Sequence, residues 1–355
     1  LNTSHIEEIS SSMNEPEWLK NYRKSSLSIY DNLPIETSPL YNKYTDAKKM
    51  DPEKVSLSNT TTETVPAFLQ KRLGELENEI CIIQIGTNIH RINLPDELKS
   101  KGLVISSISD AIQNNFELVK KALEASDSGD DKFTALNNAA FNSGIFIHIP
   151  RNFILDKPIY FLTCLSEDGH STISRNIIFA DESSKSTLVQ ELYSANIQTQ
   201  QAYLELMNTN VAANAQLDVT TLQMMDQQAV TFSTKRTDLG QDAKVNWYSG
   251  LFGSMLSRYK IEYFLNGSGA SSNDSEVVFG NNEQSFDIQT NVNHESPSTE
   301  GRVVEKSILR NKSKSLFKGM IRIKENATKS NSFLSGRSIL LDPDAKSDSI
   351  PGLEI

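Results

Sequence analysis

The sequence predicts a mainly β protein, in which a β-solenoid follows a mostly helical N-terminal region. From Ile145 onward, short runs of alternating apolar and polar residues return roughly every 10 to 16 residues, with no convincing helix between them. This spacing suits a sandwich or barrel as well as a solenoid. Two observations favour the solenoid. No Lys or Arg lies between Lys185 and Lys235, where amide side chains can stack between coils, and Asn266-Gly267 is the only Asn-Gly hairpin signal. We assign residues 141–355 to this domain.

The composition limits the class of protein. At 355 residues the chain exceeds one comfortable core, so two or more structural units are expected. The net charge of −10 argues against a nucleic-acid partner, because a phosphate backbone attracts a basic surface. No apolar run is long enough to cross a membrane, and no secretory signal is recognisable. We therefore expect a cytoplasmic protein that binds neither nucleic acid nor membrane.

Residues 1–140 are expected to form a mostly helical N-terminal α+β domain. The stretch "NEPEWLKNYRKSSLSIYDNLP" predicts an amphipathic helix that is capped by Asn14 and ends before Pro34. Residues 36–65 are rich in Ser, Thr and Asn and predict a loose arm. A short helix is expected from Phe68 to Leu76.

The rest of this domain combines a hairpin with two helices. Apolar and polar residues alternate on either side of Gly86 in "ICIIQIGTNIHRINLP", as they do in a β-hairpin. The stretch at 107–125 predicts one continuous helix with Ser109 as its cap, and the stretch at 131–144 predicts another.

Few side chains of the β region qualify as chemical candidates. Cys81 and Cys164 lie far apart in apolar runs, which favours buried thiols over a disulfide or redox pair. Trp247 is interpreted as a core residue. The stretch "NGSGASSN" lacks a following helix and a Gly-Lys-Ser/Thr signature, so ATP binding by this chain is not expected. His294 follows a regular strand and is the candidate cofactor-binding residue, since a neutral imidazole there could bind metal or accept a proton. The simpler interpretation is that its nitrogens satisfy backbone groups in the turn between coils.

One stretch, "GRVVEKSILRNKSKSLFKGMIRIKE", is basic. Its charges mostly alternate with apolar residues at period two, as on the exposed face of consecutive strands. A solvated face is the simpler interpretation, and an electrostatic contact with an acidic partner is the functional one. No catalytic residue and no firm metal ligand is assigned anywhere in the chain.

Several blocks of the sequence resemble the SufBD family of iron–sulfur cluster assembly proteins. They are "NEPEWLKNYRKSSLSIYDNLP", "ISDAIQNNFELVKKAL", "KFTALNNAAFNSGIFIHIPRNFILDKPIYF", "LDVTTLQ", and most specifically "FDIQTNVNHESPSTEGRVVEKSILRNKSKSLFKGMIRIKENATKS" with "SILLDPDAKSDSIPGLEI" after it. The blocks occur in the family's order and span nearly the whole chain. At about Gly336, where SufB-type members carry a cysteine, this chain has none, so it resembles the SufD-type members.

The resemblance implies a fold and a role. The fold is a right-handed parallel β-helix behind a helical N-terminal domain, with the family's C-terminal helical segment expected after Ile355. The role is that of a non-catalytic scaffold, which pairs with a SufB-like or identical subunit and binds a SufC-type ABC ATPase through that later segment. A transient iron–sulfur cluster at the subunit interface is implied, with no firmly bound cofactor. We expect the pairing edge to comprise Ser338, Ile339, Leu340, Leu341, Leu353 and Ile355.

A polysaccharide-acting enzyme is the alternative function, since many β-helices cleave acidic sugars. Such an enzyme needs clustered Asp residues for Ca²⁺ or paired carboxylates on one strand face. The acidic residues of the β region are dispersed along the sequence, as Glu191, Glu205, Asp218 and Asp226 illustrate. This spread disfavours the enzyme.

Overall fold

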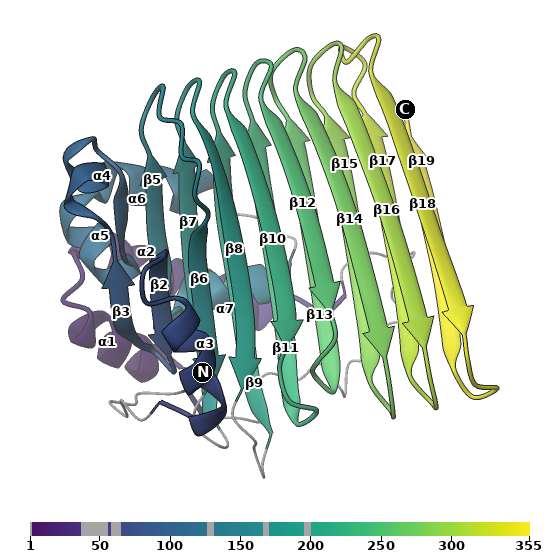
Figure 1. The fold of residues 1–355 in the computed structure, drawn as a ribbon, viewed down its shortest axis with the longest axis horizontal. Coiled ribbons are helices and arrows are strands. Elements are labelled where there is room, and N and C mark those ends of the chain that lie inside the picture. Colours follow the sequence, from purple (N-terminus) through teal and green to yellow (C-terminus); the bar gives the residue numbers. More distant parts are fainter. Residues whose placement is uncertain (1, 37–55, 58–64, 126–130, 166–169, 195–199) are drawn as a thin grey trace.

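The computed structural model shows a β-solenoid with helices packed around its N-terminal end (Figure 1). It describes residues 2–36, 56–57, 65–125, 131–165, 170–194 and 200–355. Two sheets lie face to face, and from β5 onward the chain alternates between them, so that each strand pairs in parallel with the strand two further along. The predicted β-helix with a helical N-terminal region is confirmed.

The strands of each sheet follow one another along the solenoid axis. The ten-stranded sheet contains β1 (Ser56–Leu57), β4 (Val104–Ser107), β5 (Ile145–Ile149), β7 (His170–Ala180), β9 (Gln201–Val211), β11 (Ala229–Leu239), β13 (Leu256–Leu265), β15 (Ser285–His294), β17 (Lys314–Ile323) and β19 (Lys346–Glu354). The nine-stranded sheet contains β2 (Ile80–Ile85), β3 (Asn88–Asn93), β6 (Ile159–Leu165), β8 (Lys185–Ser194), β10 (Gln216–Met224), β12 (Lys244–Leu251), β14 (Ser271–Gly280), β16 (Glu300–Leu309) and β18 (Asn331–Leu340).

The turns between the sheets explain why hairpin signals are scarce in the sequence. Each turn from the ten-stranded sheet into the next strand of the nine-stranded sheet, from β5 to β18, contains one residue in the left-handed region. These residues are Asn152, Ser183, Asn214, Asp242, Gly269, Ser298 and Lys329. Asn, Asp, Ser and Gly tolerate this conformation best, and a single such residue turns the chain without a two-residue hairpin. A small buried residue, such as Ala215 or Ala243, follows it and stacks between coils.

Period-two alternation places one set of side chains inside the solenoid. The largest inward residue is Trp247, which is fully buried with Tyr259, Tyr263 and Phe286 around it. The prediction that Trp247 belongs to the core is therefore confirmed. Cys81 and Cys164 are free and buried, as predicted, but they face the outer side of the nine-stranded sheet.

The helices cover the outer face of the first coils. They are α1 (Thr3–Ser12), α2 (Glu17–Asn32), η3 (Ala67–Leu69), α3 (Gln70–Glu75), α4 (Asp96–Ser100), α5 (Ile108–Asn114), α6 (Phe116–Ala125) and α7 (Lys132–Ala140). Phe133 of α7 stacks on Phe232 of β11 with ring centroids 4.5 Å apart, and α2 packs on α7. The buried Arg23 of α2 lies over the Phe141 ring and donates to Glu15. These contacts hold the helices on the ten-stranded sheet.

Two details of the predicted helices are wrong. Asn14 does not cap the second helix, because its backbone turns with φ 50° and the helix begins only at Glu17, after Pro16. The predicted helix at 107–125 is divided at Asn115 into α5 and α6, and its cap is Ser107 rather than Ser109. The Ser107 hydroxyl accepts from the Asp110 backbone N–H at 3.0 Å, which fixes the start two residues earlier than the pattern indicated.

The other N-terminal predictions have mixed outcomes. The hairpin around Gly86 is confirmed, since β2 and β3 pair antiparallel and Gly86 has φ 59°. Most of the predicted arm at 36–65 lies outside the described residues; within it, β1 pairs with β7. The strands β2, β3 and β4 join the two solenoid sheets, although they precede residue 140.

Candidate functional site

The solenoid ends on two strands that have a neighbour on one side only. β18 pairs with β16, β19 pairs with β17, and within the described chain no further strand follows either of them. The inward-facing residues of β16 are buried, whereas the residues of β18 in register with them are half-buried or exposed. The last coil, β18 with β19, therefore leaves the interior of the solenoid uncovered at the yellow end of Figure 1.

The predicted edge residues form two groups at this end. Ile339, Leu340 and Leu341 lie where β18 ends, and their exposed fractions are 57%, 49% and 55%. Leu353 and Ile355, which are 65% and 88% exposed, lie where β19 ends, at the opposite end of the coil (Figure 1). Both groups are apolar and face solvent, so the last coil presents the chemistry of an interface.

Ser338 has a different role from the other predicted edge residues. Its hydroxyl lies 2.7 Å from that of Ser307 on β16 and 2.6 Å from that of Ser347 on β19. It links β18 to β16 in the coil before and to β19 within the last coil. Hydroxyl contacts of this kind hold the terminal strands together where apolar packing ends.

His294 is fully buried at the end of β15, two coils before the last. Its Nδ1 lies 2.7 Å from the Thr299 hydroxyl and its Nε2 lies 3.2 Å from the Ser332 hydroxyl. Burial lowers the pKa of His294, so the imidazole is neutral at pH 7. Because both nitrogens have hydroxyl partners, one in the turn and one on β18, a satisfied structural imidazole fits this geometry better than metal binding does.

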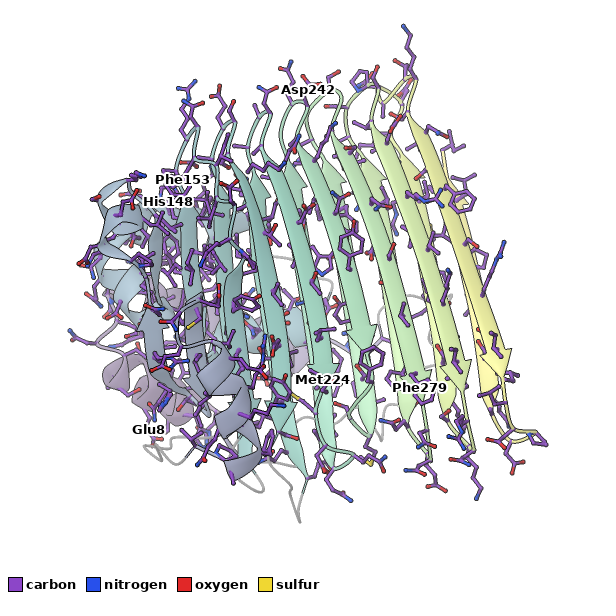
Figure 2. The ribbon with its side chains drawn as sticks, in the orientation of Figure 1. Glu8, His148, Phe153, Met224, Asp242 and Phe279 are labelled. Carbon is purple, nitrogen blue, oxygen red and sulfur yellow. The ribbon has the colours of Figure 1, made fainter. Side chains whose placement is uncertain are left out.

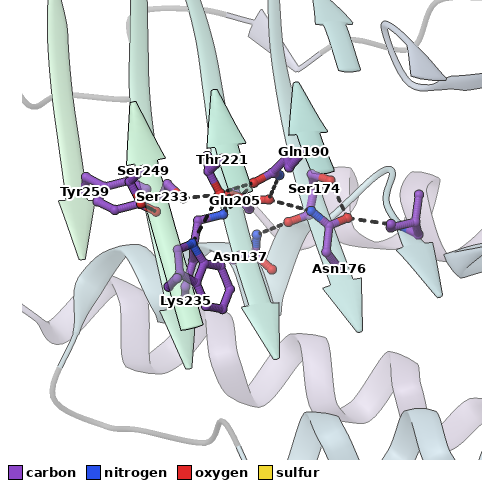
Figure 3. Close-up of polar contacts among 12 residues, drawn as sticks. Asn137, Ser174, Asn176, Gln190, Glu205, Thr221, Ser233, Lys235, Ser249 and Tyr259 are labelled. Carbon is purple, nitrogen blue, oxygen red and sulfur yellow. Dashed lines mark hydrogen bonds and ion pairs between the residues drawn. The ribbon is translucent and has the colours of Figure 1, made fainter. Parts of the chain in front are cut away.

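The solenoid interior contains an ion pair that sequence analysis did not single out. Lys235 Nζ on β11 donates to Glu205 Oε2 on β9 at 2.9 Å and to Gln190 Oε1 on β8 at 2.7 Å (Figure 3). Asn176, Gln190 and Ser233 also donate to the Glu205 carboxylate. Burial alone would raise the pKa of Glu205, but Lys235 and these donors hold it below its usual value. Glu205 is therefore a buried, compensated anion.

A second interior cluster holds acids without a cation. Asp274 and Glu276 on β14 and Glu305 on β16 all point inward and are 0–1% exposed. Tyr263 donates to Asp274 at 2.8 Å and Thr290 to Glu276 at 2.6 Å, yet each carboxyl keeps one oxygen without a partner. The described inward positions of β13 to β18 include no Lys or Arg. These groups form an uncompensated acid cluster next to the open end.

The electrostatics of this acid cluster follow from burial. Burial raises the pKa of Asp274 and that of Glu305 each to about 7, and it raises the pKa of Glu276 well above its usual value. The neighbouring Asp274 carboxyl contributes further to the shift of Glu276. Asp274 and Glu305 are thus largely neutral in weak acid and begin to ionise near pH 7, and the raised pKa of Glu276 likewise favours its neutral form.

Alternation could have revealed the acid cluster but not the ion pair. Asp274, Glu276 and Glu305 alternate with half-buried or exposed residues, whereas Glu205 and Lys235 lie in strands that are buried on both faces. The sequence alone does not set the register, because Thr and Ser occupy both faces of the strands.

The dispersed acidic residues do not gather into a catalytic pair. Glu191 faces outward and binds Arg72, Asp218 faces outward and accepts from Asn246, and Asp226 lies in a turn. The acid cluster does bring carboxyls together, but in a closed interior without access for a polysaccharide. Across the ranges described, no three His, Cys, Asp or Glu side chains are placed to hold a metal ion. No helix in those ranges is long and apolar enough to cross a membrane.

The basic stretch is largely exposed, as its alternation indicated. Arg302 lies over the Phe333 ring at 4.7 Å, and Lys306 is exposed on the same outer face of the nine-stranded sheet. Lys318 is the exception, since it is fully buried on the outer face of the ten-stranded sheet. It binds Asp287 at 2.7 Å and lies 3.7 Å from Glu36.

Comparisons with known proteins assign the chain to a family. Residues 163–355 match the family model described as "SUF system FeS cluster assembly, SufBD core domain", and residues 14–161 match "SufBD protein N-terminal region". An iron–sulfur cluster assembly SufBD family protein of Staphylococcus aureus (strain USA300) is 26% identical over 366 residues, covering 100% of this chain and 79% of the relative. A protein of the same name from Staphylococcus saprophyticus is 26% identical over 371 residues, with the same coverage. This chain is a member of the SufBD family of iron–sulfur cluster assembly proteins.

Proposed function

We propose that this chain is a SufD-like scaffold subunit, which pairs through its last coil with another SufBD-type subunit. The last coil carries the proposal, because within the described chain it has two strand edges without a neighbour and five exposed apolar side chains in two groups, one at each end of the coil. An open strand edge pairs readily with another strand, and a solenoid without a polar cap needs a covering element. A second β-helix placed end to end would continue both sheets and cover both apolar groups.

The proposed role in assembly follows from the family. A nascent iron–sulfur cluster is the cargo of the pair, held transiently at the subunit interface, and a SufC-type ATPase supplies the hydrolysis. The chain itself is a non-catalytic, cytoplasmic scaffold. Its lack of a cysteine at Gly336 supports the SufD-like assignment, because a thiolate is the common protein ligand of iron–sulfur clusters. Co-elution of the complete gene product with the host's SufC-type ATPase on size exclusion tests this partner.

Pairing is tested by blocking the free edge of β18. The backbone N–H of Asn331 donates to a carbonyl just before β16, and the backbone N–H of Leu341 donates to a carbonyl of β16. Because successive N–H groups point to opposite sides of a strand, the even-numbered N–H groups of β18 point to the free edge. Leu340→Pro removes one of them without breaking a bond inside the chain. We expect Leu340→Pro, and separately Leu340→Asp with Leu353→Asp, to convert dimers into monomers in light scattering after size exclusion.

The controls separate pairing from general surface effects. Ile154→Asp changes an equally exposed isoleucine (67%) in a turn far from the last coil, and it should leave the dimer intact. The measurement is made on the chain alone and with a SufB-like subunit, which distinguishes a homodimer from a heterodimer. Unchanged dimers in both edge variants, with normal circular dichroism spectra, would contradict pairing through the last coil.

A further inference from the structure

A row of apolar side chains crosses the outer face of the nine-stranded sheet. Residues in register on neighbouring strands define it, and we call it the outer apolar row: Ile85, Cys164, Tyr193, Met224, Phe279, Ile308 and Ile339. Between Met224 and Phe279, Phe252 follows β12 directly and bonds to Gln223 through its backbone N–H. The row thus extends from the first coil to the last.

The chain itself covers the first part of this row. Leu69, Leu73 and Leu76, from η3, α3 and the residue after α3, pack with Ile85 and Cys164 in one buried cluster. In the row beside it, Glu191 of β8 binds the side chain of Arg72 from the same helical segment. This part of the sheet is therefore covered by a helical segment that packs leucines on the apolar row and pairs one charged side chain with an opposite charge on the sheet.

The second part of the row has no such cover in the described chain. Met224, Phe279 and Ile339 are 36%, 38% and 57% exposed, and Val277 next to the row is 42% exposed. Met224 and Phe279 lie on the open face of the sheet in Figure 2. These exposed side chains are as apolar as those of the covered part, although an apolar side chain that faces water contributes less to the stability of the fold than a buried one.

The charge beside the row changes sign between its two parts. The row that contains Glu191 continues in register through Leu222, Gly250 and Val277 to Lys306 and Arg337. Lys306 and Arg337 are both exposed, and the C-terminal halves of β10, β12, β14, β16 and β18 carry no carboxylate on this face. Where the covered part offers an anion to Arg72, the open part offers two cations.

We propose that the open part of the outer apolar row binds an amphipathic helix of a partner protein, with leucine-type side chains on one face and carboxylates beside them. The helix lies across β10 to β18 as the η3–α3 segment lies across the first strands. Its apolar face covers Met224, Phe279 and Ile339, and its carboxylates bind Lys306 and Arg337. This surface meets the pairing coil only at β18, through Arg337 and Ile339, and its other residues lie on earlier strands, so it adds a second interaction to the proposed scaffold.

The experiment uses a peptide of known composition as the partner. The peptide contains residues 66–78 of this chain, held helical by a staple, with Arg72→Glu, and its control is the same peptide with Arg72 retained. Fluorescence anisotropy measures binding of each peptide to the full chain. We expect the Glu peptide to bind at least about tenfold more tightly than the Arg peptide at low salt, because close opposite charges fix such contacts.

Charge reversal on the protein provides the decisive control. Lys306→Glu with Arg337→Glu should invert the preference in favour of the Arg peptide, and Phe279→Ser should weaken both peptides. Lys244→Glu, on the same face but at the start of β12, should change neither. Equal binding of the two peptides, no binding of either, or a preference unaffected by the double reversal would overturn the proposal. Of these variants only Arg337→Glu lies on β18, and light scattering of the Lys306→Glu, Arg337→Glu protein shows whether pairing is kept, so the two proposals are tested separately.

Discussion

Lys235→Met is expected to destabilise the solenoid by about 3 to 5 kcal/mol, because it leaves Glu205 as an uncompensated anion in the interior. The Lys235 ammonium is fully buried, binds Glu205 and Gln190, and lies 5.5 Å from the Trp247 ring centroid. No water can replace it from outside. Urea unfolding followed by circular dichroism measures the loss.

The double variant shows that charge, rather than volume, causes this loss. Glu205→Gln with Lys235→Met removes both charges and should recover a large part of the lost stability, since a neutral amide costs less to bury than a lone carboxylate. Lys244→Met, which changes an exposed lysine on β12, should alter stability by less than about 0.5 kcal/mol. A loss in Lys235→Met no larger than in Lys244→Met would show that the pair contributes nothing.

The last coils are expected to lose stability as the pH rises from about 5 to about 8. Asp274 and Glu305 have folded-state pKa values of about 7, and that of Glu276 is also raised, whereas unfolded carboxyls titrate near pH 4. Groups with raised pKa values contribute stability that is complete below the unfolded pKa and lost as the pH rises through the folded pKa. The expected loss is about 2 to 4 kcal/mol, from the linkage of proton uptake to folding.

A neutral isostere at one of the three carboxyls should remove part of this pH dependence. Glu276→Gln keeps the shape of the side chain but cannot ionise, so it should stabilise the protein at pH 8 and change little at pH 5. Hydrogen exchange of β14 and β16 at both pH values locates the effect in the last coils. Glu300→Gln, an exposed change at the start of β16, is the control. Faster exchange at pH 5 than at pH 8, after correction for intrinsic rates, would contradict the assignment.

At low pH, the dependence of stability on pH has the opposite sign. Burial alone would raise the pKa of Asp131, but Arg258 and Lys260 hold it well below its usual range. Glu205 is held low by Lys235 in the same way. These carboxylates contribute stability above the unfolded pKa, which is lost as the pH falls through their folded pKa values. Maximum stability is therefore expected in weak acid, between the two transitions.

The sequence predicted the β-solenoid correctly, because its main signal is local and repeats. Alternation, few hairpin pairs and the missing cations between Lys185 and Lys235 all follow from stacked coils, whatever their exact register. The break at Asn115 and the cap at Ser107 were not predicted. They depend on which of several good capping residues the packed helix uses, and neighbouring helices decide that.

What the sequence determined by itself was the class of fold, the helical N-terminal region, the family and the apolar ending of the last strands. Only the tertiary structure decided which polar residues face inward and which charges meet. Glu205 and Lys235 are 30 positions apart in sequence and join only through the register of β9 with β11. Glu276 and Glu305 likewise come into register only when β14 pairs with β16. The physical reason is that stacked coils bring together residues that are about one coil apart in the sequence. That separation depends on the lengths of the turns, which vary from coil to coil.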